Sequence, residues 1–227
     1  MNKEMNSPKI PIEERLQFIT NQWSERSIPQ QVESVCRGGG RWIQLRLKQT
    51  DIETWIKIGA EVKTICHEFG AKLIVNDHVE FALRVDADGV HLGKEDMPME
   101  KARQLLGEDK IIGGTANSVE EIIELYRKGV NYVGLGPFRH TTTKQKLSPT
   151  LGLEGYHNIM NVLNDHGITL PIFGIGGIEP GDVEELSATG IHGVVISSLL
   201  ANSDDIETLT KQLIHKLKRT NQHVIHR

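Results

Sequence analysis

Two cations and two carboxylates follow short apolar runs in the first half of the chain, where they could bind phosphate oxygens and a divalent metal ion. Arg46 and Lys48 alternate with leucines, so both side chains are expected on one face of a strand. Asp77 and Asp96 follow the next two apolar runs. Carboxylates beside cations and a phosphate pocket suit Mg²⁺, which often also bridges substrate oxygens. We therefore predict a metal site at Asp77 and Asp96, although aspartates at strand ends also commonly cap helices.

Three later segments carry residues that suit phosphate binding. Thr141, Thr142, Thr143 and Lys144 follow a Gly-Pro stop, and short hydroxyls with one flexible ammonium can surround a phosphate. The segments Gly174 to Ile178 and Val194 to Ser198 are apolar runs that end in glycine or serine, where backbone N–H groups can face a second phosphate. The sequence therefore predicts two anion sites.

Regular spacing of apolar runs indicates the elements that must position these residues. Segments with helical periodicity, such as 52–69 and 119–126, separate the runs and are long enough to connect parallel strands. Eight such units in this length fit a single (β/α)₈ TIM barrel over residues 13–227, preceded by an extension of residues 1–12. The eight predicted strands are 16–20, 42–47, 73–75, 89–92, 111–114, 132–135, 172–175 and 193–196.

Barrel geometry gives the polar residues a common location. The chemistry of such barrels lies at the carboxyl ends of the strands, and the polar residues named above follow predicted strands. Cations that face the inside of a barrel need an anion, because an unpaired buried charge is costly. A ligand with phosphate groups is therefore expected at this end of the barrel.

Composition excludes several other classes of protein. The formal net charge of -4 and a pI near 6.2 argue against a nucleic-acid partner held by net positive charge. Cys36 and Cys66 form no CxxC pair, so reduced thiols in a cytoplasmic protein are expected. The apolar runs are strand-sized, which predicts no membrane span, and the N-terminus lacks the apolar region of an export signal. The sequence is compatible with a homo-oligomer but does not determine the oligomeric state.

Other residues that often act in catalysis have simpler interpretations. His91 follows a strand and is expected to be a hydrogen-bonded core or rim histidine rather than a base. Trp23, Trp42 and Trp55 show no stacking pattern, so packing in the core or at an interface is the default expectation.

Taken together, the motifs resemble those of the thiamine phosphate synthase family, in order, from about residue 16 to 200. The resemblance implies a (β/α)₈ transferase that joins hydroxymethylpyrimidine diphosphate to hydroxyethylthiazole phosphate and releases diphosphate. The matching stretches are Gln44-Leu-Arg-Leu-Lys48, Asn76-Asp77, Ala87 to Asp96, Gly134-Leu-Gly-Pro137, Thr141-Thr-Thr-Lys144, Gly174-Ile-Gly-Gly-Ile178 and Ile196-Ser197.

The resemblance also implies a role for each matching residue. Arg46, Lys48 and Lys144 are the expected catalytic cations, which with Mg²⁺ on Asp77 and Asp96 would stabilise the departing diphosphate. Asn76 adds a polar contact. The remaining implied contacts are Gln44 and Thr115 with the aminopyrimidine, and Thr141, Thr143, Gly177, Ile196 and Ser197 with the thiazole phosphate.

A few positions depart from the family's usual pattern. Leu47 stands where glutamate is typical, and alternation points it away from Arg46 and Lys48. Thr115 replaces a serine, which keeps the hydroxyl but adds a methyl group to the pyrimidine pocket. His140 and Thr142 replace prolines, so the loop that carries them should be less rigid before substrate binds. None of these changes removes a charge that the reaction needs.

Three alternatives remain open from the sequence alone. The related thiazole tautomerase resembles the synthase but uses a histidine after the fifth strand, where this chain reads Thr115-Ala-Asn117-Ser118. A non-catalytic binder of a phosphorylated ligand would need the cations but not the paired aspartates. An aldolase would need a Schiff-base lysine, for which Lys48 could serve, but the threonine-rich loop would then have no role.

Overall fold

The computed structural model describes residues 14–140 and 149–224, and within them the strands form one closed parallel barrel. Each strand pairs with its sequence neighbours, and β8 pairs with β1, with Leu16 opposite Val194. This confirms the predicted (β/α)₈ barrel, whereas the predicted extension lies outside the described residues. The strands are β1 (Leu16–Ile19), β2 (Trp42–Leu45), β3 (Lys72–Asn76), β4 (Gly89–Leu92), β5 (Ile111–Ala116), β6 (Tyr132–Leu135), β7 (Ile172–Ile175) and β8 (Gly193–Ile196).

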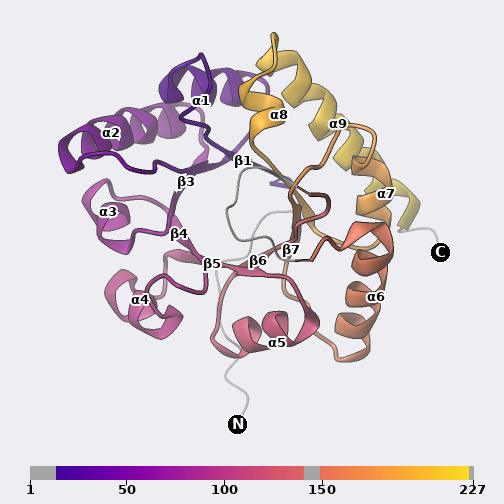
Figure 1. Cartoon of the computed structure of the whole chain (residues 1–227). Helices are drawn as coiled ribbons and strands as arrows, with labels where there is room; N and C mark the ends of the chain where they lie inside the picture. The colour runs from indigo at the N-terminus through magenta and orange to yellow at the C-terminus, as the bar shows by residue number, and fades with distance from the viewer. Residues whose placement is uncertain (1–13, 141–148, 225–227) are drawn as a thin grey trace.

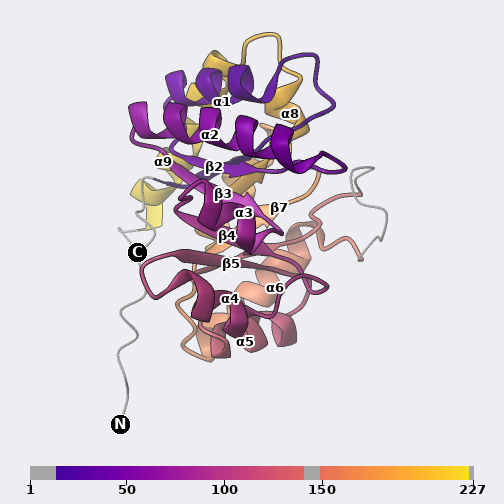
Figure 2. The same cartoon turned by 90° about the vertical axis from the view of Figure 1, so that its left-hand side faces the viewer.

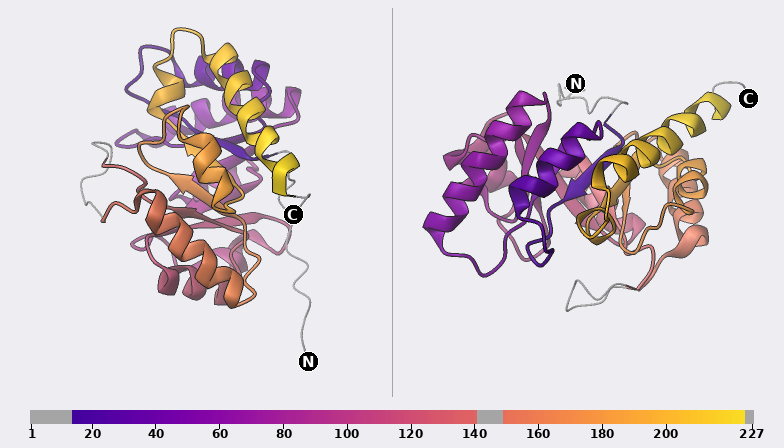
Figure 3. Two further views of the ribbon diagram at one scale, coloured as in Figure 1. Left: turned by 90° about the vertical axis from the view of Figure 1, so that its right-hand side faces the viewer. Right: turned by 90° about the horizontal axis from the view of Figure 1, so that it is seen from above.

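The helices surround the barrel as an outer ring (Figure 1). None in the described ranges is both long and apolar enough to cross a lipid bilayer. Figure 2 shows α1 and α2 side by side, and Figure 3 shows α9 lying along α1 and α7, where it completes the ring. The helices are α1 (Ile28–Arg37), α2 (Ile52–Glu68), α3 (Val79–Arg84), α4 (Met99–Leu106), α5 (Val119–Arg127), α6 (Gly152–Asp165), α7 (Val183–Ala188), α8 (Ser198–Ala201) and α9 (Ile206–Val224).

Both faces of the strands are buried, as expected for parallel strands under helices. The outward side chains pack under the helices in a continuous apolar layer. The inward ones form a separate cluster inside the barrel, in which the rings of Trp42, Tyr132 and Phe173 pack at centroid distances of 5.2 to 5.7 Å. Gly113 makes room for this cluster, because a Cβ there would lie 2.2 Å from the Tyr132 ring. The polar residues inside the barrel lie next to this aromatic layer.

Local sequence explains where several helices begin. The Ser118 hydroxyl accepts a hydrogen bond from the Glu121 N–H and caps α5, as its position before two glutamates predicts. Asp205 accepts one from the Thr208 N–H and precedes α9 in the same way. The N-caps of α3 and α4 are His78 and Pro98. Neither Asp77 nor Asp96 therefore has the helix-capping role that was their simpler interpretation.

Candidate active site

The predicted site residues that the structure describes lie at or just beyond the carboxyl ends of the strands, which face the same rim because all strands are parallel. Thr141, Thr143 and Lys144 lie outside the described residues, so their predicted roles stay predictions. The described members are Gln44, Arg46 and Lys48 after or on β2, Asn76 and Asp77 at β3, Asp96 after β4, Thr115 on β5, Gly177 after β7, and Ile196 and Ser197 at β8.

Side chains from the loop after β1 hold the segment that carries both cations. The regular strand β2 ends at Leu45 rather than at the predicted Leu47. Beyond that point the Thr20 hydroxyl bonds to both backbone groups of Arg46, accepting from its N–H at 2.9 Å and donating to its carbonyl at 3.2 Å. Gln22 makes the same pair of bonds with the backbone of Lys48. Its side-chain oxygen accepts from the Lys48 N–H at 2.5 Å, and its side-chain nitrogen donates to the Lys48 carbonyl at 2.8 Å. The extended alternation therefore continues, and Leu47 points into the apolar core as predicted.

Lys48 and the two aspartates form one electrostatic group across the ends of β2, β3 and β4. The Lys48 ammonium makes an ion pair with Asp77 Oδ2. Burial alone would raise the pKa of Asp77, but Lys48 and a hydrogen bond with Asp96 hold it below its ordinary value. Burial raises the pKa of Asp96, and the neighbouring Asp77 charge adds to the effect, against a hydrogen bond of 2.6 Å from the Gly93 N–H. The two carboxyl groups thus differ in proton affinity while lying side by side.

Asp77 also has an unusual backbone conformation. Its φ is 66°, in the left-handed region that aspartate enters more easily than most residues. Its N–H donates to the His91 carbonyl at 2.9 Å, which ties the turn after β3 to β4. The turn is thereby fixed with the Asp77 carboxylate beside Lys48 and Asp96.

The two aspartates suit a metal ion that has other ligands as well. Within the described ranges, no group of three or more His, Cys, Asp or Glu side chains is placed to hold a metal. Asp77 and Asp96 would supply two carboxylates, and Mg²⁺ usually completes six oxygen ligands with water and substrate phosphates. The donor set therefore fits a metal that binds together with a phosphorylated substrate.

A chain of buried hydrogen bonds crosses the barrel interior beneath the rim. The Gln44 amide donates to Gln17 Oε1 at 3.1 Å, and Gln17 donates to the Tyr132 hydroxyl at 3.1 Å. Tyr132 lies 3.0 Å from His91 Nδ1, and His91 Nε2 lies 2.9 Å from the Thr115 hydroxyl. The sequence prediction included Gln44 and Thr115 but missed Gln17 and Tyr132 and assigned His91 only a structural role.

The bond from Gln17 leaves the Tyr132 proton available for another acceptor, and His91 Nδ1 lies within reach. The tautomer of His91 sets which partner donates in its contacts with Tyr132 and Thr115. At the other end, the buried Gln44 Oε1 receives no hydrogen bond from the described residues.

One hollow opens at this rim. It has a volume of about 250 Å³, lies at the ends of β7 and β8, and includes Gly177, Ile196 and Ser197 in its lining. Gly177 has a φ of 67°, and a Cβ there would lie 2.9 Å from the Arg139 Cβ, so this position requires glycine. A second hollow, of about 370 Å³, lies between the loop after β4 and helix α5, and Asp96 and Thr115 belong to its lining together with Glu124 and Lys128.

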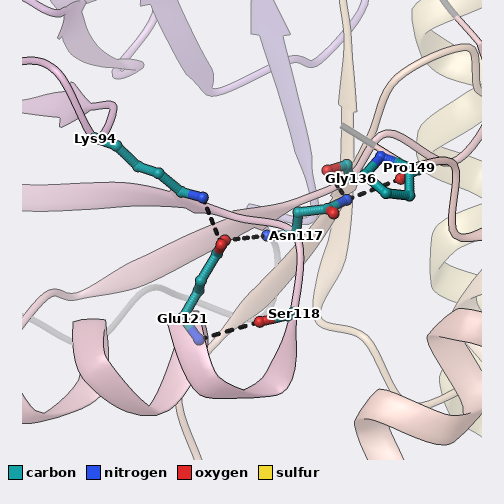
Figure 4. A network of polar contacts seen from close by, with 6 residues as sticks. All are labelled: Lys94, Asn117, Ser118, Glu121, Gly136 and Pro149. Carbon is teal, nitrogen blue, oxygen red and sulfur yellow. Dashed lines mark hydrogen bonds and ion pairs between the residues drawn. The ribbon is translucent and has the colours of Figure 1, made fainter. Parts of the chain in front are cut away.

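Asn117 fastens the base of the segment that carries the threonines (Figure 4). Its side-chain amide donates to the carbonyls of Gly136 at 2.9 Å and Pro149 at 3.0 Å, which lie on either side of that segment. Its backbone N–H donates to Glu121 at 2.8 Å, and Glu121 also pairs with Lys94. The sequence prediction noted Asn117 only as part of a stretch that contains no histidine.

Comparison with known proteins identifies the family of this chain. The family model described as "Thiamine monophosphate synthase" matches residues 16–200. A thiamine-phosphate synthase of Bacteroides thetaiotaomicron is 44% identical over 200 residues, covering 88% of this chain and 96% of the relative. One of Flavobacterium johnsoniae is 44% identical over 208 residues, covering 89% and 96%.

A solved structure shows the same arrangement in three dimensions. The thiamine phosphate pyrophosphorylase from Pyrococcus furiosus superposes with a TM-score of 0.81 at 31% identity, covering 92% of this chain and 97% of that one. The chain therefore belongs to the thiamine monophosphate synthase family and is an enzyme of the transferase class.

Proposed function

We propose that this enzyme joins hydroxymethylpyrimidine diphosphate to hydroxyethylthiazole phosphate, giving thiamine phosphate and diphosphate. The observation that carries the proposal is the group formed by Arg46, Lys48, Asp77 and Asp96 at the same rim as the hollow at the ends of β7 and β8. A diphosphate leaving group needs cations to take up its developing charge. In such a reaction the paired aspartates would bind Mg²⁺, whereas a simple phosphate binder would not need them.

In the first step, the bond between the pyrimidine methylene carbon and the diphosphate oxygen breaks, and its electron pair leaves with the oxygen. Arg46 and Lys48 hold the diphosphate and stabilise that charge, and Lys144 adds a third cation. Asp77 and Asp96 would hold Mg²⁺, which would offset further negative charge on the diphosphate. Lys48 exchanges part of its contact with Asp77 for phosphate oxygens as the substrate binds.

In the second step, the thiazole nitrogen gives its lone pair to the methylene carbon and forms the new C–N bond. No enzyme nucleophile is needed for this capture. Gln44 and Thr115 orient the aminopyrimidine: the unpartnered Gln44 Oε1 accepts from its amino group, and the Thr115 hydroxyl donates to a ring nitrogen. Asn76 adds a polar contact, and Gly177, Ile196 and Ser197, together with Thr141 and Thr143, hold the thiazole phosphate.

The direct test is a coupled assay with purified protein, both substrates, and Mg²⁺ or excess EDTA, followed by chromatography for thiamine phosphate. Product that depends on Mg²⁺ supports the proposal. Binding of thiazole phosphate without product, at any Mg²⁺ concentration, would favour a tautomerase or a non-catalytic binder instead. The tautomerase alternative has less support, because the stretch from Thr115 to Ser118 contains no histidine.

A further inference from the structure

The exposed tryptophan at the rim has no role in the reaction as described so far. Trp23 lies in the loop between β1 and α1 and is 63% exposed, whereas Trp42 and Trp55 are 0% and 2% exposed. Packing in the core is confirmed for Trp42 and Trp55 and is wrong for Trp23, whose packing at an interface stays a prediction.

The loop that carries Trp23 is held in place by hydrogen bonds. The Trp23 N–H donates to Asn21 Oδ1 at 3.1 Å. The backbone of Asn21 is bonded in turn to the buried side chain of Gln31 on α1, with its N–H donating at 3.0 Å and its carbonyl accepting at 2.8 Å. The indole is therefore presented to the rim from a fixed base.

The Trp23 ring faces the guanidinium of Arg46. Arg46 Cζ lies 5.8 Å from the ring centroid, within the range of a cation–π interaction. Among residues 14–140 and 149–224 the Arg46 side chain makes no hydrogen bond or ion pair, although the charge of Asp77 acts on it. An aromatic ring contacts the face of a guanidinium and leaves the N–H groups along its edge free. Arg46 is thus restrained while its donors stay available for phosphate oxygens.

We propose that Trp23 is a positioning residue that holds the Arg46 guanidinium in the orientation needed for the diphosphate of the substrate. The inference rests on the proposed role of Arg46 in binding diphosphate. A guanidinium recognises phosphate through a planar pair of donors, so its affinity depends on its orientation. Restraint before binding also reduces the rotamer entropy that the complex loses.

The first test measures the affinity of inorganic diphosphate, in the presence of Mg²⁺, by calorimetry on a double-mutant cycle. Trp23→Ala should weaken binding about 2- to 5-fold, the range for an exposed cation–π contact. Trp23→Phe should recover part of the loss, because it keeps an aromatic face. In an Arg46→Lys background, which has no planar fork, Trp23→Ala should have little further effect. Equal losses in both backgrounds, or no loss at all, would overturn the proposal.

Tyr126→Ala is the matched control, because Tyr126 is an aromatic residue 39% exposed on α5, outside the proposed site. It should leave diphosphate affinity unchanged. In steady-state assays Trp23→Ala should raise KM for the pyrimidine diphosphate and not for the thiazole phosphate. A general structural defect would raise both.

Fluorescence gives an independent readout, because Trp23 is the one exposed tryptophan of the three in the chain. Diphosphate should reduce quenching by acrylamide in the unmodified protein and not in Trp23→Phe. Diphosphate binding with no change in quenching would contradict the inference. If the protein binds diphosphate as predicted but forms no thiamine phosphate, the proposed function fails and the role of Trp23 stands. If Trp23→Ala is active with a normal KM, the proposed function stands and the role of Trp23 fails.

Discussion

Lys48 forms an ion pair with Asp77 across the ends of β2 and β3, so a cation proposed to bind diphosphate is already in contact with a proposed metal ligand. Without ligands, each charge compensates the other in a partly buried position. Removal of either partner leaves the other charge without this compensation. Substitution of Lys48 or Asp77 should therefore affect both diphosphate binding and metal binding.

Asp77→Asn should lower turnover by about 100-fold or more, because it removes a metal ligand where negative charge develops in the transition state. Thiazole phosphate should still bind. Asp86→Asn is a matched control, because Asp86 also has a positive φ, of 48°, and pairs with a lysine, Lys110, at 2.6 Å. Near-normal kcat in Asp77→Asn, measured at saturating Mg²⁺, would refute the metal assignment.

Asp96→Asn should abolish most turnover yet slightly raise the thermal stability of the ligand-free enzyme at neutral pH. The folded state raises the pKa of Asp96, so it favours the protonated form more than the unfolded chain does. Stability from that preference is present at low pH and is lost as the pH rises through the raised pKa. An asparagine cannot ionise and keeps an oxygen for the Gly93 N–H. A fall in Tm at pH 7, measured by calorimetry without Mg²⁺, would contradict this account.

As the pH is lowered, the apparent affinity for Mg²⁺ should begin to fall at a higher pH than the ordinary pKa of a carboxylate would predict. Asp96 must lose its proton to bind the metal, and its pKa is raised, whereas the pKa of Asp77 is lowered by Lys48 despite its burial. The loss of Mg²⁺ affinity should therefore follow the protonation of Asp96, which precedes that of Asp77 as the pH falls. Calorimetric titration of Mg²⁺ in the presence of diphosphate, repeated from neutral to acidic pH, measures it, and Asp96→Asn should remove the pH-dependent component.

Thr115→Ser should be mild and Thr115→Val severe. Serine keeps the hydroxyl that hydrogen-bonds with His91 Nε2, whereas valine removes that hydrogen bond, which has a net value of about 1 kcal/mol. Valine also removes the donor proposed for the pyrimidine, so KM for the pyrimidine diphosphate should rise. A collapse of activity in Thr115→Ser would show that the added methyl group is essential to the pocket.

Asn117→Ala should raise KM for the thiazole phosphate more than KM for the pyrimidine diphosphate. It removes two hydrogen bonds that fasten the base of the threonine-rich segment, each with a net value of about 1 kcal/mol. Tm should fall by several degrees. Asn117→Asp has nearly the same shape but lacks the amide donors, so it should not rescue the alanine variant. Rescue by aspartate would show that shape alone matters.

The strands were the most predictable part of the molecule. The bounds of β4, β6, β7 and β8 match the prediction, because each is a short apolar run next to glycine or asparagine. β2 ends two residues early, since side chains of Thr20 and Gln22 replace a neighbouring strand. The residue pattern of a strand does not predict where side chains, rather than another strand, bond to its backbone.

Other parts of the site depend on contacts between distant positions. Gln17 and Tyr132 are 115 positions apart and meet only because the barrel brings β1 and β6 to one interior. No pattern of neighbouring residues predicts this hydrogen bond, although a glutamine on each of two apolar strands was a hint that the barrel interior contains polar contacts. Trp23 was misjudged because residue type favours burial, whereas its exposure is set by the loop that Asn21 and Gln31 hold.

The pairing of β8 with β1 also determines when the catalytic centre can form during synthesis. Arg15, just before β1, donates to the carbonyls of His192 and Leu217, which are 177 and 202 positions away. Contacts of such separation are slow to form because a long loop must close first. A nascent chain that has emerged only as far as β6 holds Arg46, Lys48 and the two aspartates but not the hollow at β7 and β8. The hollow that we propose for the thiazole phosphate therefore forms only when nearly the whole chain is available to fold.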